Sequence, residues 1–222
     1  LAADHVIKDV EAFHQAIVLA SDIAEKNKLA TFGIVPRSPE TGYGYIQSEQ
    51  VQAGSGQLSA VKSFVEKPDL DTAKRYLSEG GYYWNSGMFM FKASVYLDEL
   101  KKFAPKILDC CKKSFQTEYK DLDFIRLKNN NFLQCPEKSI DYAVMEHTKE
   151  AIVVPLDANW SDIGSWEALM DSKSKDSNGN VSEGDVLLDD VNNTYAYSSN
   201  RLVSAIGVSD LIIVDTQDAL LV

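Results

Sequence analysis

Three polar residues with complementary chemistry lie beside two predicted strands. Glu66 and Lys67 end the first strand, because Pro68 has no backbone N–H for a sheet ladder and biases the residue before it toward extended geometry. Asn85 comes shortly before the second predicted strand, residues 88–91. A carboxylate, an ammonium group and an amide that converge at strand ends suit a ligand with hydroxyls and a phosphate. Alternatively, these residues are a solvated strand end and a turn former.

The residues between the two strands predict a helix. Asp69 or Asp71 can cap its start, and the glycine pair at 80–81 ends it. A strand, a helix and a strand in this order predict a βαβ-like unit, and open α/β sheets bind ligands at strand ends. Upstream, the turn-rich loop 37–44 allows close backbone approach to a ligand, and a turn at 53–57 predicts an antiparallel hairpin.

Two aspartates that lie far apart in the sequence form a second candidate site. Asp4 follows the apolar residues 1–3, and Asp162 comes shortly after the apolar run 151–155. Each aspartate could therefore project from the same edge of a sheet. Mg²⁺ binds one or two carboxylates together with phosphate oxygens and water, so two aspartates suffice. Alternatively, Asp4 and Asp162 are helix caps or turn acids.

The composition is that of an ordinary globular protein. The 222 residues are 45% hydrophobic and 25% charged, and the formal net charge is −11. This charge argues against a nucleic-acid or anionic-membrane surface, although it leaves room for a phosphorylated small ligand. The three cysteines include no CxxC pair and indicate free thiols in a reducing compartment. No window is apolar enough to span a membrane and we find no signal peptide, so we expect a cytoplasmic protein.

The composition changes near residue 176, where a polar linker is followed by short β-rich runs. We therefore predict one domain over residues 1–175 and a β-rich segment over 176–222. The apolar residues 1–3 and 219–222 read as strands cut in mid-run, which predicts that the chain is an internal fragment of a longer protein.

Six motifs in a fixed order carry a family resemblance: LAADHVI, PETGYGYI, FVEKP, WNSGMF, SIDYAVME and WSDIGSW. Together they resemble the nucleotidyltransferase family of mannose-1-phosphate guanylyltransferases, especially the bacterial type that is often fused to a mannose-6-phosphate isomerase. Each motif alone is weak, but six in the right order are a strong signal. The resemblance extends into the β-rich end, through GDVLLDD and SAIGVSDLIIVDT.

The resemblance implies an α/β fold with a Rossmann-like mixed sheet flanked by helices, followed by the small β-rich segment. It also implies the reaction of GTP with mannose 1-phosphate to give GDP-mannose and pyrophosphate, a step toward polysaccharides. The sugar phosphate attacks the nucleotide directly, so no side-chain nucleophile is required. The implied substrates are GTP and mannose 1-phosphate, the implied cofactor is Mg²⁺, and we expect a homodimer.

The resemblance also implies residue roles. Asp4 and Asp162 would hold Mg²⁺ and act in catalysis together with Lys67, which would meet the sugar phosphate. The implied sugar-binding residues are Tyr43, Gly44, Glu66, Lys67, Asn85 and Gly87.

One departure from the family pattern is that the glycine-rich nucleotide loop lies outside this sequence. We therefore expect the fragment to be inactive by itself, and its base specificity is not visible. Two alternatives stay open: a nucleotidyltransferase for another hexose 1-phosphate or nucleotide, and a regulatory module that binds a sugar nucleotide without turnover.

Overall fold

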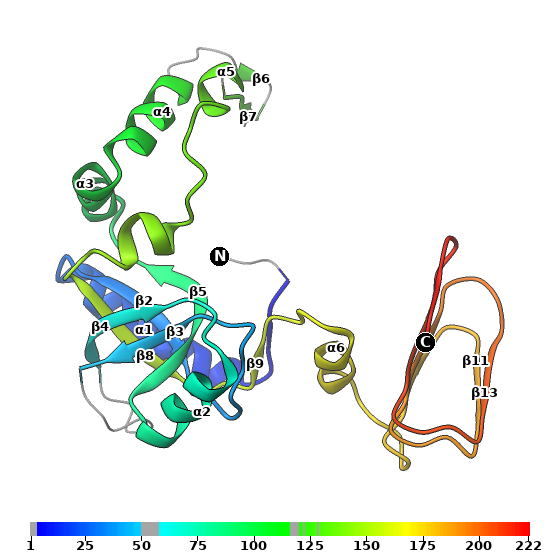
Figure 1. Ribbon diagram of the computed structural model, residues 1–222. Coiled ribbons are helices and arrows are strands. Elements are labelled where there is room, and N and C mark those ends of the chain that lie inside the picture. Colours follow the sequence, from blue (N-terminus) through cyan, green and yellow to red (C-terminus); the bar gives the residue numbers. More distant parts are fainter. Residues whose placement is uncertain (1–3, 50–57, 116–119, 122, 128) are drawn as a thin grey trace. The chain divides into compact units, whose positions relative to one another are not determined.

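The computed structural model describes residues 4–49, 58–115, 120–121, 123–127 and 129–222 (Figure 1). The chain forms two compact units, of which the first is Asp9–Ala158 and the second combines residues 4–8 with Asn159–Val222. The predicted boundary after residue 175 falls inside the second unit. Within the described part of the chain, no helix is long and apolar enough to cross a membrane. The predicted turn at 53–57 lies outside the described residues.

A mixed sheet forms the centre of the first unit. Its strands are β2 (Leu29–Ile34), β5 (Tyr82–Met90), β3 (Tyr45–Ser48), β4 (Ser59–Val65) and β8 (Ala151–Leu156), in that spatial order. β2 and β8 are parallel, whereas the other neighbours are antiparallel. The mixed sheet confirms the predicted α/β class. Because β8 pairs with both β2 and β4, the sheet also closes into a barrel, which the sequence did not predict.

The predicted strand, helix and strand are present with two corrections. The first is that Lys67, expected in extended geometry before Pro68, has a φ of +45°. β4 ends at Val65, and Asp69 caps α2 (Leu70–Glu79) by accepting a hydrogen bond from the Thr72 backbone N–H at 2.8 Å. β4 and β5 are each antiparallel to β3, so they run parallel to each other. The second correction concerns β5, which begins at Tyr82 rather than at residue 88.

Asn85 therefore lies within a strand, at the edge of a bulge. Asn85 pairs with Gly33 and Phe89 with Thr31, so residues 86–88 of β5 lie opposite a single residue of β2. The Ser86 hydroxyl donates to the carbonyl of that residue, Phe32, at 2.6 Å. A bulge re-aims neighbouring side chains. Asn85 is thus part of the sheet, and the alternative that it forms a turn is wrong.

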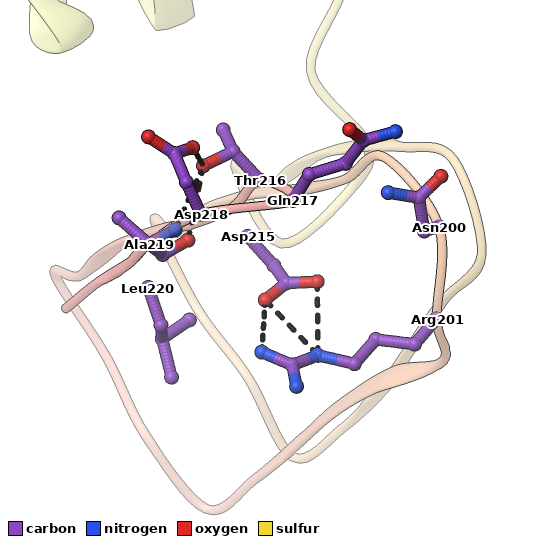
Figure 2. A pocket seen from close by; sticks show the side chains of 8 residues that line it. All are labelled: Asn200, Arg201, Asp215, Thr216, Gln217, Asp218, Ala219 and Leu220. Atoms are coloured by element: carbon purple, nitrogen blue, oxygen red, sulfur yellow. Dashed lines mark hydrogen bonds and ion pairs between the residues drawn. The ribbon is translucent and has the colours of Figure 1, made fainter.

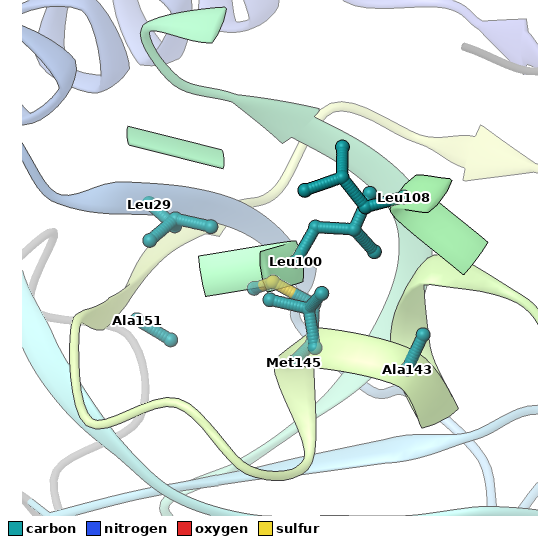
Figure 3. Packing of buried hydrophobic residues seen from close by; sticks show 7 residues of the cluster. Leu29, Leu100, Leu108, Ala143, Met145 and Ala151 are labelled. Carbon is teal, nitrogen blue, oxygen red and sulfur yellow. The ribbon is translucent and has the colours of Figure 1, made fainter. Parts of the chain in front are cut away.

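Of the helices of the first unit, α1 (Val10–Glu25) packs against β2, β5 and β8. Further along the chain lie α3 (Ala93–Phe103), α4 (Pro105–Phe115), the short α5 (Asn129–Phe132) and the π-helical turn η1 (Asp141–Met145). α3 packs against α4 and η1, and α4 packs against α5. The short pair β6 (Lys120–Asp121) and β7 (Phe124–Ile125) lies between α4 and α5 in the sequence. Figure 3 shows Leu29 and Ala151 of the sheet in one buried cluster with Leu100, Leu108 and Met145. This cluster anchors η1 against the sheet.

The second unit begins with β1 (Val6–Ile7), which pairs antiparallel with β9 (Trp160–Ser161), and continues through α6 (Trp166–Ser172). The remaining strands are β10 (Val181–Glu183), β11 (Val186–Asp189), β12 (Tyr195–Ser198), β13 (Val203–Ile206), β14 (Ile212–Asp215) and β15 (Leu220–Leu221). β10, β12 and β14 stack in parallel, and so do β11 and β13. The predicted β-rich segment therefore winds into successive turns whose strands stack in parallel, as in a β-helix. We call this segment the parallel coil.

Candidate active site

Gly44, Glu66 and Asn85 meet where three neighbouring strands begin, end or bulge. The backbone N–H of Asn85 donates to the Gly44 carbonyl at 2.7 Å. A Cβ atom on Gly44 would lie 2.6 Å from the Glu66 Oε2 atom and 3.5 Å from the Asn85 Cβ atom. Because glycine has no side chain, position 44 leaves room for the Glu66 carboxylate beside Asn85.

Hydrogen bonds fix the orientation of the Asn85 side chain. Its Nδ2 atom donates to Asp141 Oδ1 at 2.9 Å, and its Oδ1 atom accepts from the Gly87 backbone N–H at 3.2 Å. Gly87 has a φ of +67°, a conformation that favours glycine. A primary amide has two N–H donors and two lone pairs. The amide is thus oriented while keeping capacity to bind a hydroxyl group.

Asp141 brings a second carboxylate to this cluster. It starts η1, and single π-helical turns are frequent at functional sites. The next residue, Tyr142, has its pKa raised by partial burial first and then by the Glu66, Glu146 and Asp141 carboxylates. The negative charges of both carboxylates in the cluster therefore disfavour ionisation of Tyr142, which stays protonated at neutral pH.

Lys67 lies beside Glu66 in a strained backbone conformation. Its φ is +45°, which is uncommon for a residue with a side chain and which recurs at functional sites. The Lys67 Nζ atom is 4.0 Å from Glu66 Oε1, and its side chain is 65% exposed. The turn thus presents a cation to solvent next to the carboxylate cluster.

Tyr43 completes the group of residues predicted to bind sugar. Its ring packs edge-on against Trp84 with the centroids 5.1 Å apart. Trp84 is buried in β5 next to Asn85. Tyr43 is therefore anchored beside Gly44. We call Tyr43, Gly44, Glu66, Lys67, Asn85, Gly87 and Asp141 the polar cluster.

Asp4 and Asp162 lie at the same end of the short β1–β9 pair. Val6 pairs with Ser161, so Asp162 follows β9 at the end of the pair where Asp4 and His5 precede β1. The Asp162 Oδ1 atom accepts from the Gly164 backbone N–H at 2.9 Å, and His5 Nδ1 accepts from Trp160 Nε1 at 3.2 Å. Two carboxylates with hard oxygen donors fit Mg²⁺ if phosphates and water complete its coordination. Among the described residues, no group of three or more His, Cys, Asp and Glu could hold a metal ion by itself.

A polar hollow in the second unit is of a different kind (Figure 2). There, Arg201 Nε lies 3.1 Å from both Asp215 carboxylate oxygens, and its Nη2 atom also contacts Oδ1. The Asp215 side chain is only 2% exposed and it raises the pKa of Arg201. Because the arginine charge compensates a buried carboxylate, we read this pair as structural.

Comparison with known proteins identifies the family. The protein-family model described as nucleotidyl transferase matches residues 1–179 of this chain. The chain belongs to the nucleotidyl transferase family. A second model, described as a MannoseP isomerase/GMP-like beta-helix domain, matches residues 184–222 and thus most of the parallel coil.

This nucleotidyl transferase is similar to several named proteins. It is 53% identical over 224 residues to a mannose-1-phosphate guanylyltransferase of Escherichia coli, covering 100% of this chain and 47% of that protein. It is 53% identical over 222 residues to the xanthan biosynthesis protein XanB of Xanthomonas campestris pv. campestris, covering 100% of this chain and 46% of that protein. The chain thus spans about half the length of the curated relatives it matches.

Among solved structures, the fold is similar to that of a mannose-1-phosphate geranyltransferase from Thermus thermophilus. The TM-score is 0.84 at 29% identity, over 100% of this chain and 63% of that one. A mannose-6-phosphate isomerase from Helicobacter pylori matches 72% of this chain and 61% of its own, at 42% identity and a TM-score of 0.63. These findings confirm the resemblance inferred from six motifs.

The structure adds one residue to the predicted site of this nucleotidyl transferase. Asp141 lies inside the motif SIDYAVME, although no site role was predicted for it from the sequence. The available signal was an acid at the start of a short helix in a family motif. The contact to Asn85, far away in the sequence, was visible only in the fold.

Proposed function

We propose that the complete protein transfers GMP from GTP to mannose 1-phosphate and releases pyrophosphate. The observation that carries this proposal is the contact of Gly44, Glu66 and Asn85 at the ends and bulge of adjacent strands, with Asp141 bound to Asn85. The similarity over the whole chain to a protein named mannose-1-phosphate guanylyltransferase supports the choice of substrates.

The polar cluster contains groups of opposite charge, and these orient the sugar phosphate. Glu66 and Asp141 repel a phosphate but accept hydrogen bonds from hydroxyl groups. Lys67 offers a cation to solvent, 4.0 Å from the Glu66 carboxylate. The hydroxyl groups of mannose would therefore face Glu66, Asn85 and Asp141, and its phosphate would face Lys67.

The chemical step needs positioning and charge neutralisation. A phosphate oxygen of mannose 1-phosphate attacks the α-phosphorus of GTP, the new P–O bond forms, and pyrophosphate leaves with the electrons of the broken bond. Lys67 would hold the attacking phosphate while the hydroxyl contacts fix the sugar. No side chain forms a covalent intermediate in this scheme.

Asp4 and Asp162 would hold Mg²⁺, which neutralises phosphate charge when bound. Their position at one end of the β1–β9 pair supports this assignment. We also propose that the metal is Mg²⁺, that the protein is cytoplasmic and that it forms a homodimer. These three expectations come from the sequence.

The test is pyrophosphate release by the complete protein with Mg²⁺ and mannose 1-phosphate, across GTP, ATP, UTP and dTTP. Release with GTP alone supports the proposal. Release with another nucleotide would identify a different nucleotidyltransferase. No release by folded protein, combined with binding of GDP-mannose, would favour a regulatory module.

A further inference from the structure

Three cysteines meet at the contact between α4 and the segment that follows α5. Cys110 and Cys111 lie on α4, and Cys135 lies three residues after α5. The Cys110 Sγ atom contacts the carbonyl oxygen of Gln134, the neighbour of Cys135, at 3.7 Å. All three thiols are free. Residues far apart in the sequence thus form one thiol cluster.

Two further hydrogen bonds hold the segment in place. The Asn131 Nδ2 atom donates to the Lys113 carbonyl of α4 at 3.0 Å, and the Cys135 backbone N–H donates to the Phe132 carbonyl at 2.9 Å. The Asn131 bond and the Cys110 contact to Gln134 thus attach the segment to α4 on both sides of Phe132. Because Cys135 follows the residue that Cys110 contacts, its side chain is kept within reach of α4.

The three thiols have different surroundings. Cys135 is partly buried, and its pKa is raised by burial first and then by the adjacent Cys111 and Cys110 side chains. Cys111 is exposed and lines an open apolar hollow of about 670 Å³ with Leu108 and Phe132. A small reagent therefore reaches Cys111 first, with Cys135 beside it.

We propose that Cys111 and Cys135 are a redox modification site that forms a reversible intramolecular disulfide with a small-molecule disulfide as oxidant. The Cys111 thiolate attacks the reagent and releases one thiol, leaving a mixed disulfide. The Cys135 thiolate then attacks the Cys111 sulfur and releases the second thiol. In total, two cysteine thiols are oxidised to one disulfide and the reagent is reduced to two thiols.

Two other pairings exist among the three thiols. Cys110 and Cys111 are neighbours on a helix, where successive side chains point in different directions. The Cys110 Sγ atom contacts the carbonyl of Gln134, the neighbour of Cys135, so Cys110–Cys135 is the competing pair. Cys111 is preferred because it is exposed to the reagent, whereas Cys110 is only partly exposed. The new bond would fasten the segment after α5 to α4, and this inference does not rest on the proposed reaction.

To test this, the complete, folded protein is treated with oxidised glutathione. Remaining free thiols are then blocked with iodoacetamide, and the tryptic peptides are mapped by mass spectrometry. Residues 107–112 and 129–138 fall in separate tryptic peptides, so a disulfide joins two identifiable masses. We expect the joined peptides from the wild type and from Cys110→Ser, and their loss in Cys111→Ser and Cys135→Ser. Dithiothreitol should separate them.

Thermal unfolding supplies a second measurement, because a cross-link restricts the unfolded chain. The oxidised form should have a higher melting temperature than the reduced form in the wild type and Cys110→Ser only. Joined peptides that persist in Cys111→Ser would overturn the proposal. So would glutathione adducts without joined peptides in the wild type, or a disulfide found only between two chains.

Discussion

Asn85 donates its side-chain amide to the Asp141 carboxylate over 2.9 Å, although the two residues are 56 positions apart in the sequence. Asn85 belongs to β5 of the sheet and Asp141 starts η1. The orientation of a candidate sugar-binding amide therefore depends on a helical turn that reaches the sheet from a distant part of the chain.

Asp141→Ala should raise the KM for mannose 1-phosphate about 10- to 100-fold, because a hydrogen bond to a charged group contributes roughly 1.5–3 kcal/mol. The variant removes the acceptor of Asn85 and a carboxylate from the polar cluster. Asp141→Asn keeps an acceptor and should have a smaller effect. Steady-state kinetics of the complete protein measures both.

The control for Asp141 is Glu146→Ala, which removes an exposed carboxylate at the end of the same turn. Its KM should remain close to that of the wild type. An unchanged KM in folded Asp141→Ala would remove Asp141 from the site.

Gly44→Ala should reduce kcat/KM for the sugar phosphate with little loss of stability. The added methyl group would approach Glu66 Oε2 to 2.6 Å, and the end of a flexible side chain can move away. The displaced carboxylate no longer lies beside Asn85. Gly42→Ala is a matched control in the same loop, because a Cβ there meets nothing within 4 Å. Equal activities of the two variants would argue against a binding role for Glu66.

Asp4→Asn and Asp162→Asn should each abolish turnover at ordinary Mg²⁺ concentrations if these carboxylates hold the metal. High Mg²⁺ should restore part of the activity, since a weakened site can still be filled by mass action. Asp185→Asn changes an exposed acid of the same unit and should leave the Mg²⁺ dependence unchanged. Wild-type Mg²⁺ titration curves for both site variants would contradict the metal assignment.

Asn180→Ala should lower the free energy of unfolding by about 2–4 kcal/mol. Asn180 is buried at 3% exposure, where its amide donates to the Val191 carbonyl at 2.8 Å and accepts from the Thr194 N–H at 3.0 Å. Both backbone groups would lose their partner. Exposed Asn200 is the control, and Asn200→Ala should change stability by no more than about 0.5 kcal/mol. Urea denaturation measures the difference.

The second unit should lose stability in acid as the Glu183 carboxylate becomes protonated. Its pKa is lowered below the ordinary 4.5, first by the hydrogen bond from Lys173 and then by that from Tyr195. A carboxylate with a lowered folded-state pKa contributes stability above its unfolded pKa, and this contribution is lost as the pH falls through the folded value.

Glu183→Gln should therefore melt below the wild type at neutral pH, and the gap should close as the pH falls below about 4.5. Melting temperatures at several pH values between about 7 and 3 test this expectation. A gap that stays constant down to about pH 3 would show that the charge of Glu183 is not responsible.

Local chemistry made several features predictable from the sequence. Pro68 stops a strand, Asp69 caps a helix and six ordered motifs indicate the family, because each signal acts within a few residues of itself. Glu66, Lys67 and Asn85 could be proposed as site residues in the same way, since they lie next to such signals.

Other features depend on contacts between distant residues. The bulge at Asn85 exists because β5 pairs with β2, and the barrel closes because β8 pairs with both β2 and β4. The parallel coil uses the same short strands that another β fold could use, so strand pattern alone leaves their pairing open. Asp141 and the thiol cluster likewise become visible only when η1 and the segment after α5 pack. Sequence thus determined the local elements and the family, whereas long-range packing decided which side chains meet.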